Sequence, residues 1–274
     1  MTALTPEGVA EHDARRLAQV LREIGGDGAP INSGWMACDI PGSWADYAAG
    51  LGLSGTVSDQ ELDDLEAFYD TRERPCRVQV TPFQHPSLMA GLERRGFKAI
   101  DRDSVLVHPL DALPDMPTCD GLTFREVDPN ESVDIEAFCT AQGRAFFPDG
   151  QLPEGMHPIS RRVAAHRRST IWLVERDERL IASGGIETFK GSSVLFAGGV
   201  APEARRRGVH SALITHRLHF AKAQGFNHAL IASVPGGPTE RNAQRLGFSL
   251  VYTHLLFERH ARTARAQPVE RHFG

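Results

Sequence analysis

Apolar and polar positions in the second half of the chain switch repeatedly between the spacing of a helix and that of a strand. Residues 209–224 carry two adjacent apolar stripes at helical spacing, so we expect much of this helix's surface to be buried. Short apolar runs bounded by turn residues predict strands between the helices. The expected helices cover 131–146, 158–168, 209–224 and 238–246, and the expected strands cover 171–175, 180–189, 194–200, 228–234 and 250–257.

A proline-rich stretch precedes this half. Residues 109–121 contain three prolines and follow neither period, which predicts an extended linker. A chain of 274 residues is also long enough for two domains. The division that this predicts is a first domain over 1–112, a second domain over 121–258 and a frayed tail over 259–274.

The first half contains an echo of the second. Arg77–Leu106 aligns without a gap onto His228–Phe257, at a constant offset of 151. Each segment reads as a strand, a turn with proline, a short helix, a corner with the pattern R-x-G-F and a final strand. The shared order favours a duplicated unit, and chance similarity is the alternative because few residues are identical.

Composition narrows the classes of protein. No apolar stretch reaches the roughly 18 residues of a membrane span, and acidic residues interrupt any signal-peptide pattern at the N-terminus. The four cysteines follow no ligand spacing, which favours reduced thiols in the cytoplasm. Residues 1–120 hold 20 acidic and 10 basic side chains, whereas residues 121–274 hold 15 and 20. This asymmetry indicates an anionic ligand on the second half, unless it serves solubility alone.

The segment with candidate chemistry is 194–213, where an apolar strand enters a glycine-containing turn and a helix begins at once. The first turn of a helix leaves backbone N–H groups without intrahelical partners and carries partial positive charge. Gly208 lets an anion approach the main chain closely, and the run Arg205–Arg207 supplies guanidinium groups. The same run could instead be a solvated face or a nucleic-acid patch, although no aromatic side chains are interleaved with it.

This segment resembles the cofactor loop of the GNAT acetyltransferases, in which a strand, the pattern [RQ]-x-x-G-x-[GA] and a helix follow one another. Arg205 and Gly208 match the pattern, and His210 stands where a small residue is expected. Residues 235–248 resemble the P-G-x-x-S-x-R-N-x-x-R-x-G-F signature of a bacterial subgroup. The resemblance covers about 125–257, and the echo in the first half is similar to a truncated, degenerate copy.

The resemblance implies a mixed α/β fold with a mostly antiparallel twisted sheet flanked by helices. It also implies an acyl-CoA co-substrate, by default acetyl-CoA, and direct transfer to a small-molecule or peptide amine. Backbone N–H groups of the loop would hold the pyrophosphate, the strand before it would pair with the pantetheine arm, and Asn242 would contact that arm. The implied cofactor residues are Gly198, Val200, Arg205, Arg206, Arg207, Gly208, Val209, His210, Ser211 and Asn242.

Transfer to an amine needs a base, because freeing a lysine-like amine at pH 7 costs about 4–5 kcal/mol. Some family members have a glutamate where this chain has Val194, so Glu187 on the neighbouring strand is the nearest carboxylate. An exposed charge at a strand end is the alternative for Glu187. The tyrosine that serves many relatives as acid is replaced by Ala243, so Tyr252 is the substitute, with core packing as its alternative.

Other side chains are weaker candidates. His210 and His216 are further possible bases, and Cys139 is expected to be a buried structural thiol. His216 and His219 lack a third ligand nearby, so we predict no metal. We expect no CoA site in residues 1–112, whose acidic run over 59–66 would repel a polyanion.

The sequence therefore predicts a cytoplasmic N-acyltransferase. A non-catalytic acyl-CoA-binding or regulatory module is the first alternative, and a nucleic-acid-binding protein that uses the arginine run is the second. Consumption of thioester in the presence of amines distinguishes the first alternative, and a steep salt dependence of nucleic-acid binding distinguishes the second. The oligomeric state stays open.

Overall fold

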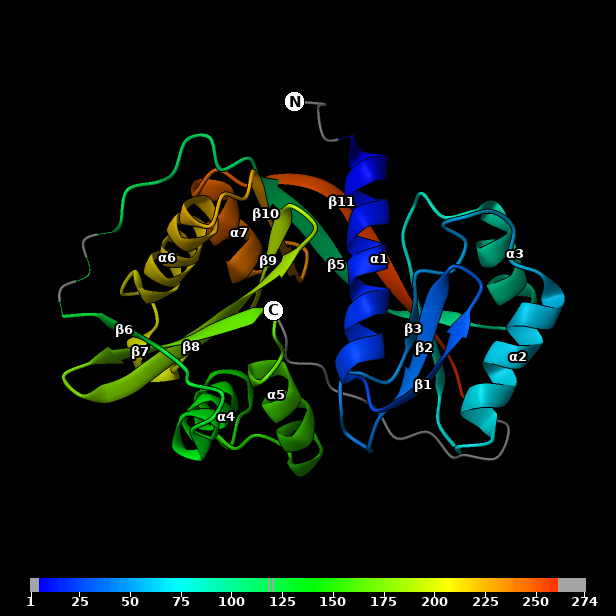
Figure 1. Ribbon diagram of the computed structural model, residues 1–274, viewed down its shortest axis with the longest axis horizontal. Helices are drawn as coiled ribbons and strands as arrows, with labels where there is room; N and C mark the ends of the chain where they lie inside the picture. Colours follow the sequence, from blue (N-terminus) through cyan, green and yellow to red (C-terminus); the bar gives the residue numbers. More distant parts are fainter. Residues whose placement is uncertain (1–4, 118, 120, 261–274) are drawn as a thin grey trace. The chain divides into compact units, whose positions relative to one another are not determined.

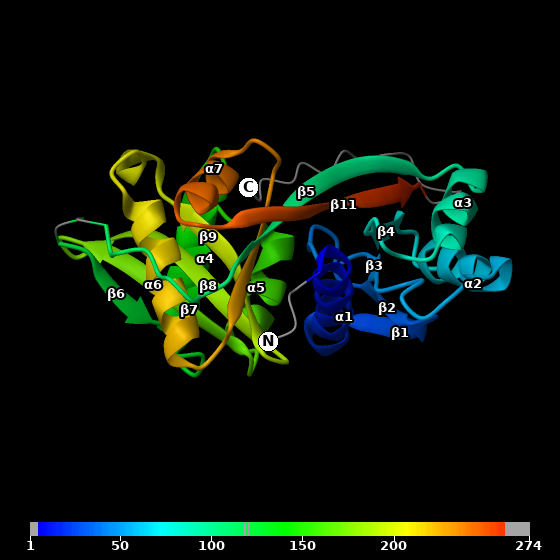
Figure 2. The same cartoon turned by 90° about the horizontal axis from the view of Figure 1, so that it is seen from above.

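The computed structural model describes residues 5–117, 119 and 121–260, which form two compact units. The first unit contains residues 5–103 and 251–260, and the second contains residues 104–250. Two long strands, β5 (Lys98–His108) and β11 (Ser249–Arg259), contribute residues to both units and are neighbours in the sheet order (Figure 2). The units therefore exchange segments of the chain.

The first unit places its strands in the order β1-β2-β3-β4-β11-β5. Only β3 and β4 are parallel among the pairs β1–β2, β2–β3, β3–β4 and β4–β11. Its elements besides β5 and β11 are α1 (Pro6–Ile24), β1 (Asp27–Ile31), β2 (Gly34–Cys38), β3 (Ala48–Ala49), α2 (Asp59–Asp70), β4 (Cys76–Val80) and α3 (Pro86–Arg94).

The two faces of this sheet receive different helices. Met36 and Cys38 of β2 join a core that α2 and α3 supply with Leu65 and Leu92. Ala37, which points the other way because side chains alternate along a strand, lies beside the end of α1. Local signals start these helices: Thr5 caps α1, and α2 begins with a capping box between its first turn and the preceding serine.

The second unit continues the order β5-β10-β9-β8-β7-β6, in which only β9 and β10 are parallel. The expected mixed, mostly antiparallel sheet flanked by helices is confirmed. Its elements are β6 (Thr123–Glu126), α4 (Ser132–Phe146), a 3₁₀ turn (Glu154–Met156), α5 (His157–Ala164), β7 (Ser169–Arg176), β8 (Arg179–Phe189), β9 (Ser192–Val200), a 3₁₀ turn (Pro202–Ala204), α6 (Val209–Ala223), β10 (His228–Ser233) and α7 (Pro238–Arg245).

Helices cover both faces of this second sheet (Figure 1). A Cβ atom at Gly198 of β9 would lie 3.0 Å from Arg217 of α6, whereas one at the next residue, Gly199, would meet Ala145 of α4 at 2.5 Å. Because successive side chains alternate, α6 and α4 lie on opposite faces. The sequence predicts α6 to be buried over much of its girth, and Leu213, Ile214 and Leu218 are fully buried.

The echo in the sequence corresponds to the same order of elements in space. An offset of 151 aligns β5 with β11 residue by residue, and it aligns α3 with α7 to within one residue at the start. The two corners turn through glycines in left-handed conformation, Gly96 (φ 77°) and Gly247 (φ 95°). β4 pairs with β11, and β10 pairs with β5. The last strand of each copy therefore pairs with a strand of the other copy, β5 with β10 and β11 with β4.

The two compact units have other bounds than the domains expected over 1–112 and 121–258, because each unit includes residues from both ends of that division. Leu106 and Leu110 are fully buried in the core of the second unit, and Phe257 lies in the core of the first unit. A proline-rich stretch marks where the chain is extended, but pairing between distant strands decides where each strand is buried. The strand at the C-terminal end also extends through Arg259, so residue 259 is not frayed, and the rest of the expected tail lies outside the described residues.

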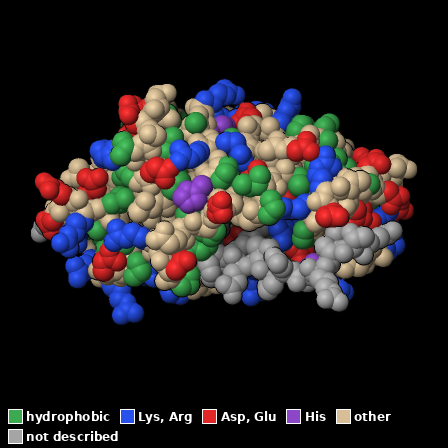
Figure 3. All heavy atoms as spheres, turned by 90° about the horizontal axis from the view of Figure 1, so that it is seen from below, with side chains coloured by type: hydrophobic (Ala, Val, Ile, Leu, Met, Phe, Trp, Pro, Cys, Tyr) green, Lys and Arg blue, Asp and Glu red, His purple; other side chains and the backbone are tan. Residues whose placement is uncertain are grey.

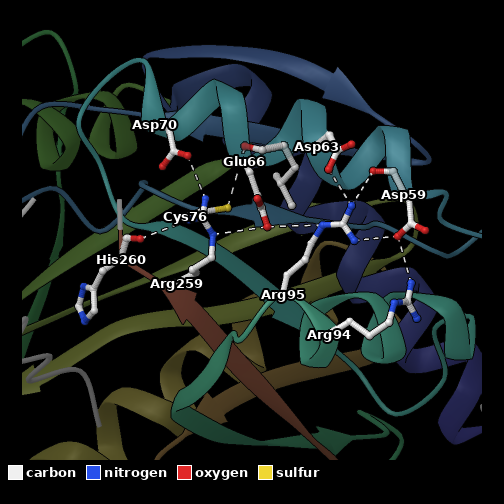
Figure 4. Close-up of polar contacts among 10 residues, drawn as sticks. Asp59, Asp63, Glu66, Asp70, Cys76, Arg94, Arg95, Arg259 and His260 are labelled. Carbon is white, nitrogen blue, oxygen red and sulfur yellow. Dashed lines mark hydrogen bonds and ion pairs between the residues drawn. The ribbon is translucent and has the colours of Figure 1, made fainter. Parts of the chain in front are cut away.

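The acidic run of the first unit is partnered by arginines from later in the chain (Figure 4). Arg95 binds Asp59 and Asp63 over 2.7 Å each and lies 3.5 Å from Glu66. Arg259 reaches the same Glu66 over 3.4 Å. Arg95 and Arg259 thus pair with three carboxylates of the acidic run, Asp59, Asp63 and Glu66, and the repulsion of a polyanion by this run stays a prediction.

One face of the molecule shows how charges are distributed over the surface. On the face drawn in Figure 3, basic and acidic side chains are interspersed and not gathered by sign. No helix in the described part of the chain combines the length and apolar character that crossing a membrane requires. Within residues 5–117, 119 and 121–260, no group of three or more histidine, cysteine, aspartate or glutamate side chains is arranged to hold a metal ion.

Candidate functional site

The parallel strands β9 and β10 part before β9 ends. They pair only from residues 192–195 to residues 228–231, whereas β9 continues to Val200. Its register with β8 also shifts beside the parting, so that Gly199 faces Ser183 and Phe196 faces Gly185. Such a shift is a β-bulge, which leaves main-chain groups of the bulged strand without ladder partners. The ladder between β9 and β10 therefore ends before the loop that enters α6, and the last residues of β9 are not paired with β10.

Arg217 of α6 supports this bulge from one face. Its Nη1 donates to the carbonyl oxygens of Gly185 at 2.9 Å and Phe196 at 3.1 Å, which lie on facing strands. The side chain is fully buried, and burial lowers its pKa to about 9. Gly184 and Gly198 are glycines beside the guanidinium, where a Cβ atom would come within 3.1 Å of it. Gly184 of β8 and Gly198 of β9 thus leave room for the Arg217 side chain.

Gln142 of α4 supports the bulge from the other face. Its Nε2 donates to the hydroxyl of Ser183 at 2.7 Å and to the carbonyl oxygen of Ala197 at 3.0 Å. Ala197 has a left-handed backbone (φ 50°), which is uncommon for a residue with a Cβ atom. The sequence gives no signal for this glutamine, because its partners are 41 and 55 residues away.

The loop after β9 ends in a left-handed glycine. Gly208 has φ 78° and immediately precedes α6, with no side chain capping the helix. A Cβ atom at Gly208 would also lie 2.7 Å from the Sγ atom of Cys119, whose thiol donates to the carbonyl oxygen of Arg207 at 3.1 Å. Both the backbone and the space therefore require glycine at this position. Cys119 was not expected here, since its place in a proline-rich stretch gives no sign of this contact.

The first turn of α6 presents main-chain donors at the end of the opening. The first intrahelical bond runs from Ala212 N to Gly208 O over 2.9 Å, so the N–H groups of Val209, His210 and Ser211 precede the helical ladder. Arg206 and Arg207 are exposed beside them. This arrangement suits an anion with several acceptor oxygens, such as a phosphate.

Arg205 binds main-chain carbonyl groups of the protein itself. Its Nε donates to the carbonyl oxygen of Val200 at 3.0 Å, and its Nη2 donates to the carbonyl oxygen of Ala145 at 2.7 Å. The guanidinium thus joins the end of β9 to the end of α4 and fixes the direction in which the loop leaves the sheet. One acceptor site of Val200, which was expected to serve the pantetheine arm, is also occupied.

His210 and Asn242 are brought together from α6 and α7. Asn242 Nδ2 lies 2.9 Å from His210 Nδ1, and Arg245 Nη1 donates to Asn242 Oδ1 at 2.8 Å. Burial and, secondarily, the charge of Arg217 lower the pKa of His210 to about 4. The imidazole is therefore neutral at pH 7.

Glu187 is buried, with 4% of its surface exposed. The alternative of an exposed strand-end charge is therefore wrong. It lies directly opposite Val194 in the pairing of β8 with β9, and its carboxylate binds Arg168 over 3.0 Å. The structure thus places a carboxylate beside the strand position at which the resemblance expects one.

Tyr252 belongs to the first unit. Its hydroxyl donates to Asp13 Oδ2 at 2.9 Å, and burial, together with the charge of Asp13, raises its pKa. A phenol that holds its proton so firmly, and already donates it to a carboxylate, is poorly suited to act as an acid. Tyr252 thus belongs to a different unit from the loop residues that it was expected to assist.

The weaker candidates Cys139 and His216 make packing contacts. Cys139 is buried, which raises the pKa of its thiol, and Ala243, which replaces the expected tyrosine, is also buried. His216 stacks on Phe124 with ring centres 4.3 Å apart, and it meets the edge of Trp172. These contacts are those of side chains that fill a core.

Comparison with known proteins gives the loop a family context. The model of the Acetyltransferase (GNAT) family matches residues 135–248, which include α6, α7 and the loop. A GCN5-related N-acetyltransferase from Kribbella flavida is 17% identical with a TM-score of 0.67, over 91% of this chain and 95% of its own. A second GCN5-related N-acetyltransferase, from Sphaerobacter thermophilus, is 18% identical with a TM-score of 0.60. The match covers 81% of this chain and 74% of the other.

A tandem GNAT protein from the clavulanic acid biosynthesis pathway is 14% identical with a TM-score of 0.57, over 75% of this chain and 70% of its own. No curated protein matches the chain. At such identities the solved structures show a common fold, and the family model matches the segment that forms the loop and the opening. Residues 135–248 thus match the GNAT acetyltransferase family, and the fold of the chain is that of solved GCN5-related N-acetyltransferases.

Proposed function

We propose that the chain is an N-acyltransferase that binds acyl-CoA along β9 and at the start of α6. One observation carries the proposal: the opening between β9 and β10 leads directly to an uncapped helix N-terminus at Gly208. An elongated ligand with an anionic end fits that combination of open main chain and convergent N–H groups. The proposed acyl group is acetyl, the acceptor is a small-molecule or peptide amine, and the setting is the cytoplasm.

The loop and the bulge have separate roles in this proposal. The N–H groups of Val209, His210 and Ser211, with the exposed Arg206 and Arg207, bind the pyrophosphate. The main chain of β9 over 196–200 pairs with the pantetheine arm and polarises the thioester carbonyl. Negative charge that develops on that oxygen is stabilised by donors that are already in place. Arg205, by its contacts with carbonyl groups, holds the loop in position.

Glu187 is the proposed base. Its carboxylate, which Arg168 contacts over 3.0 Å, takes a proton from the ammonium group of the acceptor, directly or through water. The free amine attacks the thioester carbon, the C–S bond breaks, and CoA leaves as a thiolate. The nitrogen then gives up its second proton to the thiolate or to water, which leaves a neutral amide. A thiol with a pKa near ~8.5 departs without a dedicated acid, so Tyr252 is assigned no step.

The test is consumption of acetyl-CoA with a panel of primary amines. Glu187→Gln should lower kcat/KM by about 10²-fold and abolish its rise with pH, since the base is lost. Cys139→Ala should retain turnover, because no acyl-enzyme forms. A burst of CoA equal to the enzyme concentration, absent in Cys139→Ala, would contradict direct transfer.

A non-catalytic acyl-CoA-binding module is the second candidate. Two observations favour it: Ala243 stands where many relatives have an acid, and Glu187 is already engaged by Arg168. A module of this kind would bind acetyl-CoA and consume none with any amine of the panel. Turnover that depends on Glu187 would exclude it.

A further inference from the structure

Three side chains form a chain of hydrogen bonds that ends at the first turn of α6. Arg245 Nη1 donates to Asn242 Oδ1 at 2.8 Å, and Asn242 Nδ2 lies 2.9 Å from His210 Nδ1. His210 is the second residue of α6 and stands where the family pattern has a small residue. The relay, as we call Arg245, Asn242 and His210, therefore connects α7 to the loop.

Only one assignment of protons satisfies the relay. A guanidinium group has five donors and no acceptor, so the atom of Asn242 that faces Arg245 is its carbonyl oxygen. The amide nitrogen then faces His210 and donates, which makes Nδ1 the acceptor. The ring is consequently neutral, with its proton on Nε2. The positive end of the α6 dipole acts in the same direction, because it disfavours an imidazolium at the start of the helix.

The other nitrogen of the ring is available to a ligand. His210 is partly exposed, and no residue among those the structure describes accepts a hydrogen bond from its Nε2. Nε2–H is a donor beside the N–H groups of the first turn, and phosphate oxygens are acceptors only. The same protonation excludes His210 as a general base, since Nδ1 is occupied and Nε2 already carries a proton.

We propose that His210 binds a pyrophosphate oxygen of acyl-CoA through Nε2–H, and that Asn242 and Arg245 are positioning residues that fix its tautomer. This inference rests on the proposed function of the loop. The family pattern keeps this position small and relies on main-chain donors. In this chain the His210 side chain narrows the loop and adds a hydrogen-bond donor to it.

The tautomer can be measured without any ligand. In protein labelled with ¹⁵N-histidine, with the signal assigned through His210→Ala, the wild type should show a neutral ring protonated on Nε2 at pH 7. Asn242→Asp replaces the amide donor with a carboxylate acceptor, so the proton should move to Nδ1 or the ring should become charged. An Nδ1–H or charged ring in the wild type would overturn the relay.

The proposed phosphate contact is tested by measuring the affinities of the protein for CoA and for pantetheine, which lacks phosphate. His210→Ala should lower the affinity for CoA about tenfold, because a hydrogen bond to a charged group is lost. The affinity for pantetheine should be unchanged. Asn242→Ala should weaken CoA by less, and adding it to His210→Ala should cause no further loss. His219→Ala, exposed near the other end of α6, is the matched control and should bind both ligands normally.

The outcomes separate the two proposals. Equal losses of CoA and pantetheine in His210→Ala, or no loss of CoA, would overturn the phosphate contact while the proposed function stands. Independent, additive losses in the double variant would overturn the positioning role of Asn242. A wild type that does not bind CoA would overturn the proposed function and the phosphate contact with it, while the tautomer measurement would still decide the relay.

Discussion

At Gly208 two separate constraints act on one residue. The backbone is left-handed, and the space that a side chain would need is taken by the thiol of Cys119. Gly225, just beyond the other end of α6, shares the first constraint with φ 83°, but a Cβ atom there would have no described atom within 4 Å. The two glycines therefore separate the effect of backbone strain from the effect of filling the loop.

Gly208→Val should lower the affinity for acetyl-CoA at least about tenfold, equivalent to 1.4 kcal/mol of binding free energy. The reason is that the valine side chain displaces the loop from its place at the pyrophosphate. Gly225→Val should cost a similar ~1–2 kcal/mol of unfolding free energy through its backbone, yet bind acetyl-CoA normally. Calorimetric titration measures the affinity, and urea unfolding measures the stability. Normal affinity in Gly208→Val would show that the loop is not the anion site.

Tyr252 provides a test of a structural role. Burial by itself would raise the pKa of Asp13, but Arg16, His254 and the Tyr252 hydroxyl together lower it. An aspartate with a lowered pKa contributes stability above its unfolded pKa of about 3.9, and this stability is lost as the pH falls below that value.

Tyr252→Phe should therefore cost about 1–3 kcal/mol at pH 7, since a buried carboxylate loses a donor, and less at pH 3. Its kcat/KM should keep the pH dependence of the wild type. Urea unfolding at the two pH values and pH–rate profiles provide the measurements. Loss of a falling limb near pH 10 in Tyr252→Phe would instead identify the tyrosine as a general acid.

Among the elements, β11 is held in the first unit by charges as well as by its ladder. Arg259 approaches Glu66 at 3.4 Å and Asp70 at 3.1 Å, and its side chain is only 12% exposed (Figure 4). Arg94 binds Asp59 over 3.0 Å with 59% of its side chain exposed. Exposed ion pairs contribute little to stability, whereas removing one partner of a buried pair leaves an uncompensated charge.

Arg259→Met should lower the unfolding free energy by about 2–4 kcal/mol, because Glu66 and Asp70 lose a buried partner. Arg94→Met is the exposed control and should change it by less than about 0.5 kcal/mol. Adding Glu66→Met to Arg259→Met should restore part of the loss. Equal effects of the two arginine substitutions in urea unfolding would mean that the β11 network does not stabilise the fold.

Local patterns explain which elements could be predicted from the sequence. The stripes of α6 and the strand–glycine–helix order around Gly208 lie within about 20 consecutive residues, and the structure has them at the expected positions. The contacts of Arg205 with Ala145 and of Glu187 with Arg168 join residues 60 and 19 positions apart. No periodicity carries such information, so the structural use of Arg205 and the burial of Glu187 could not be predicted.

At the scale of the whole molecule, the exchange of β5 and β11 makes each unit depend on a strand from the other copy. Leu106 is buried in a cluster whose members include Trp172, Ile186 and Phe248 of the second unit, all far from it in sequence. Composition around the linker gives no sign of this pairing, because a strand that is apolar on one face suits either sheet. The repeated order of elements was predictable, but the partner of each strand was not.

Fragments divided at the linker test this dependence. Residues 1–112 expressed alone lack β11, and residues 121–258 alone lack β5, so each should expose an unpaired sheet edge and fail to unfold cooperatively. Residues 1–112 and 113–274 expressed together should recover a soluble complex. Circular dichroism melting of each fragment gives the measurement. Two independently folded fragments would show that the exchange is not needed for either unit.

Hydrogen exchange with and without acetyl-CoA tests the central claim most directly, because it locates binding in the chain. The account predicts slower exchange of amides in 206–212 at the start of α6 and in 196–200 of β9, with residues 5–80 unchanged. Protection confined to the first unit, or no protection at saturating acetyl-CoA, would contradict an acyl-CoA site at the α6 loop.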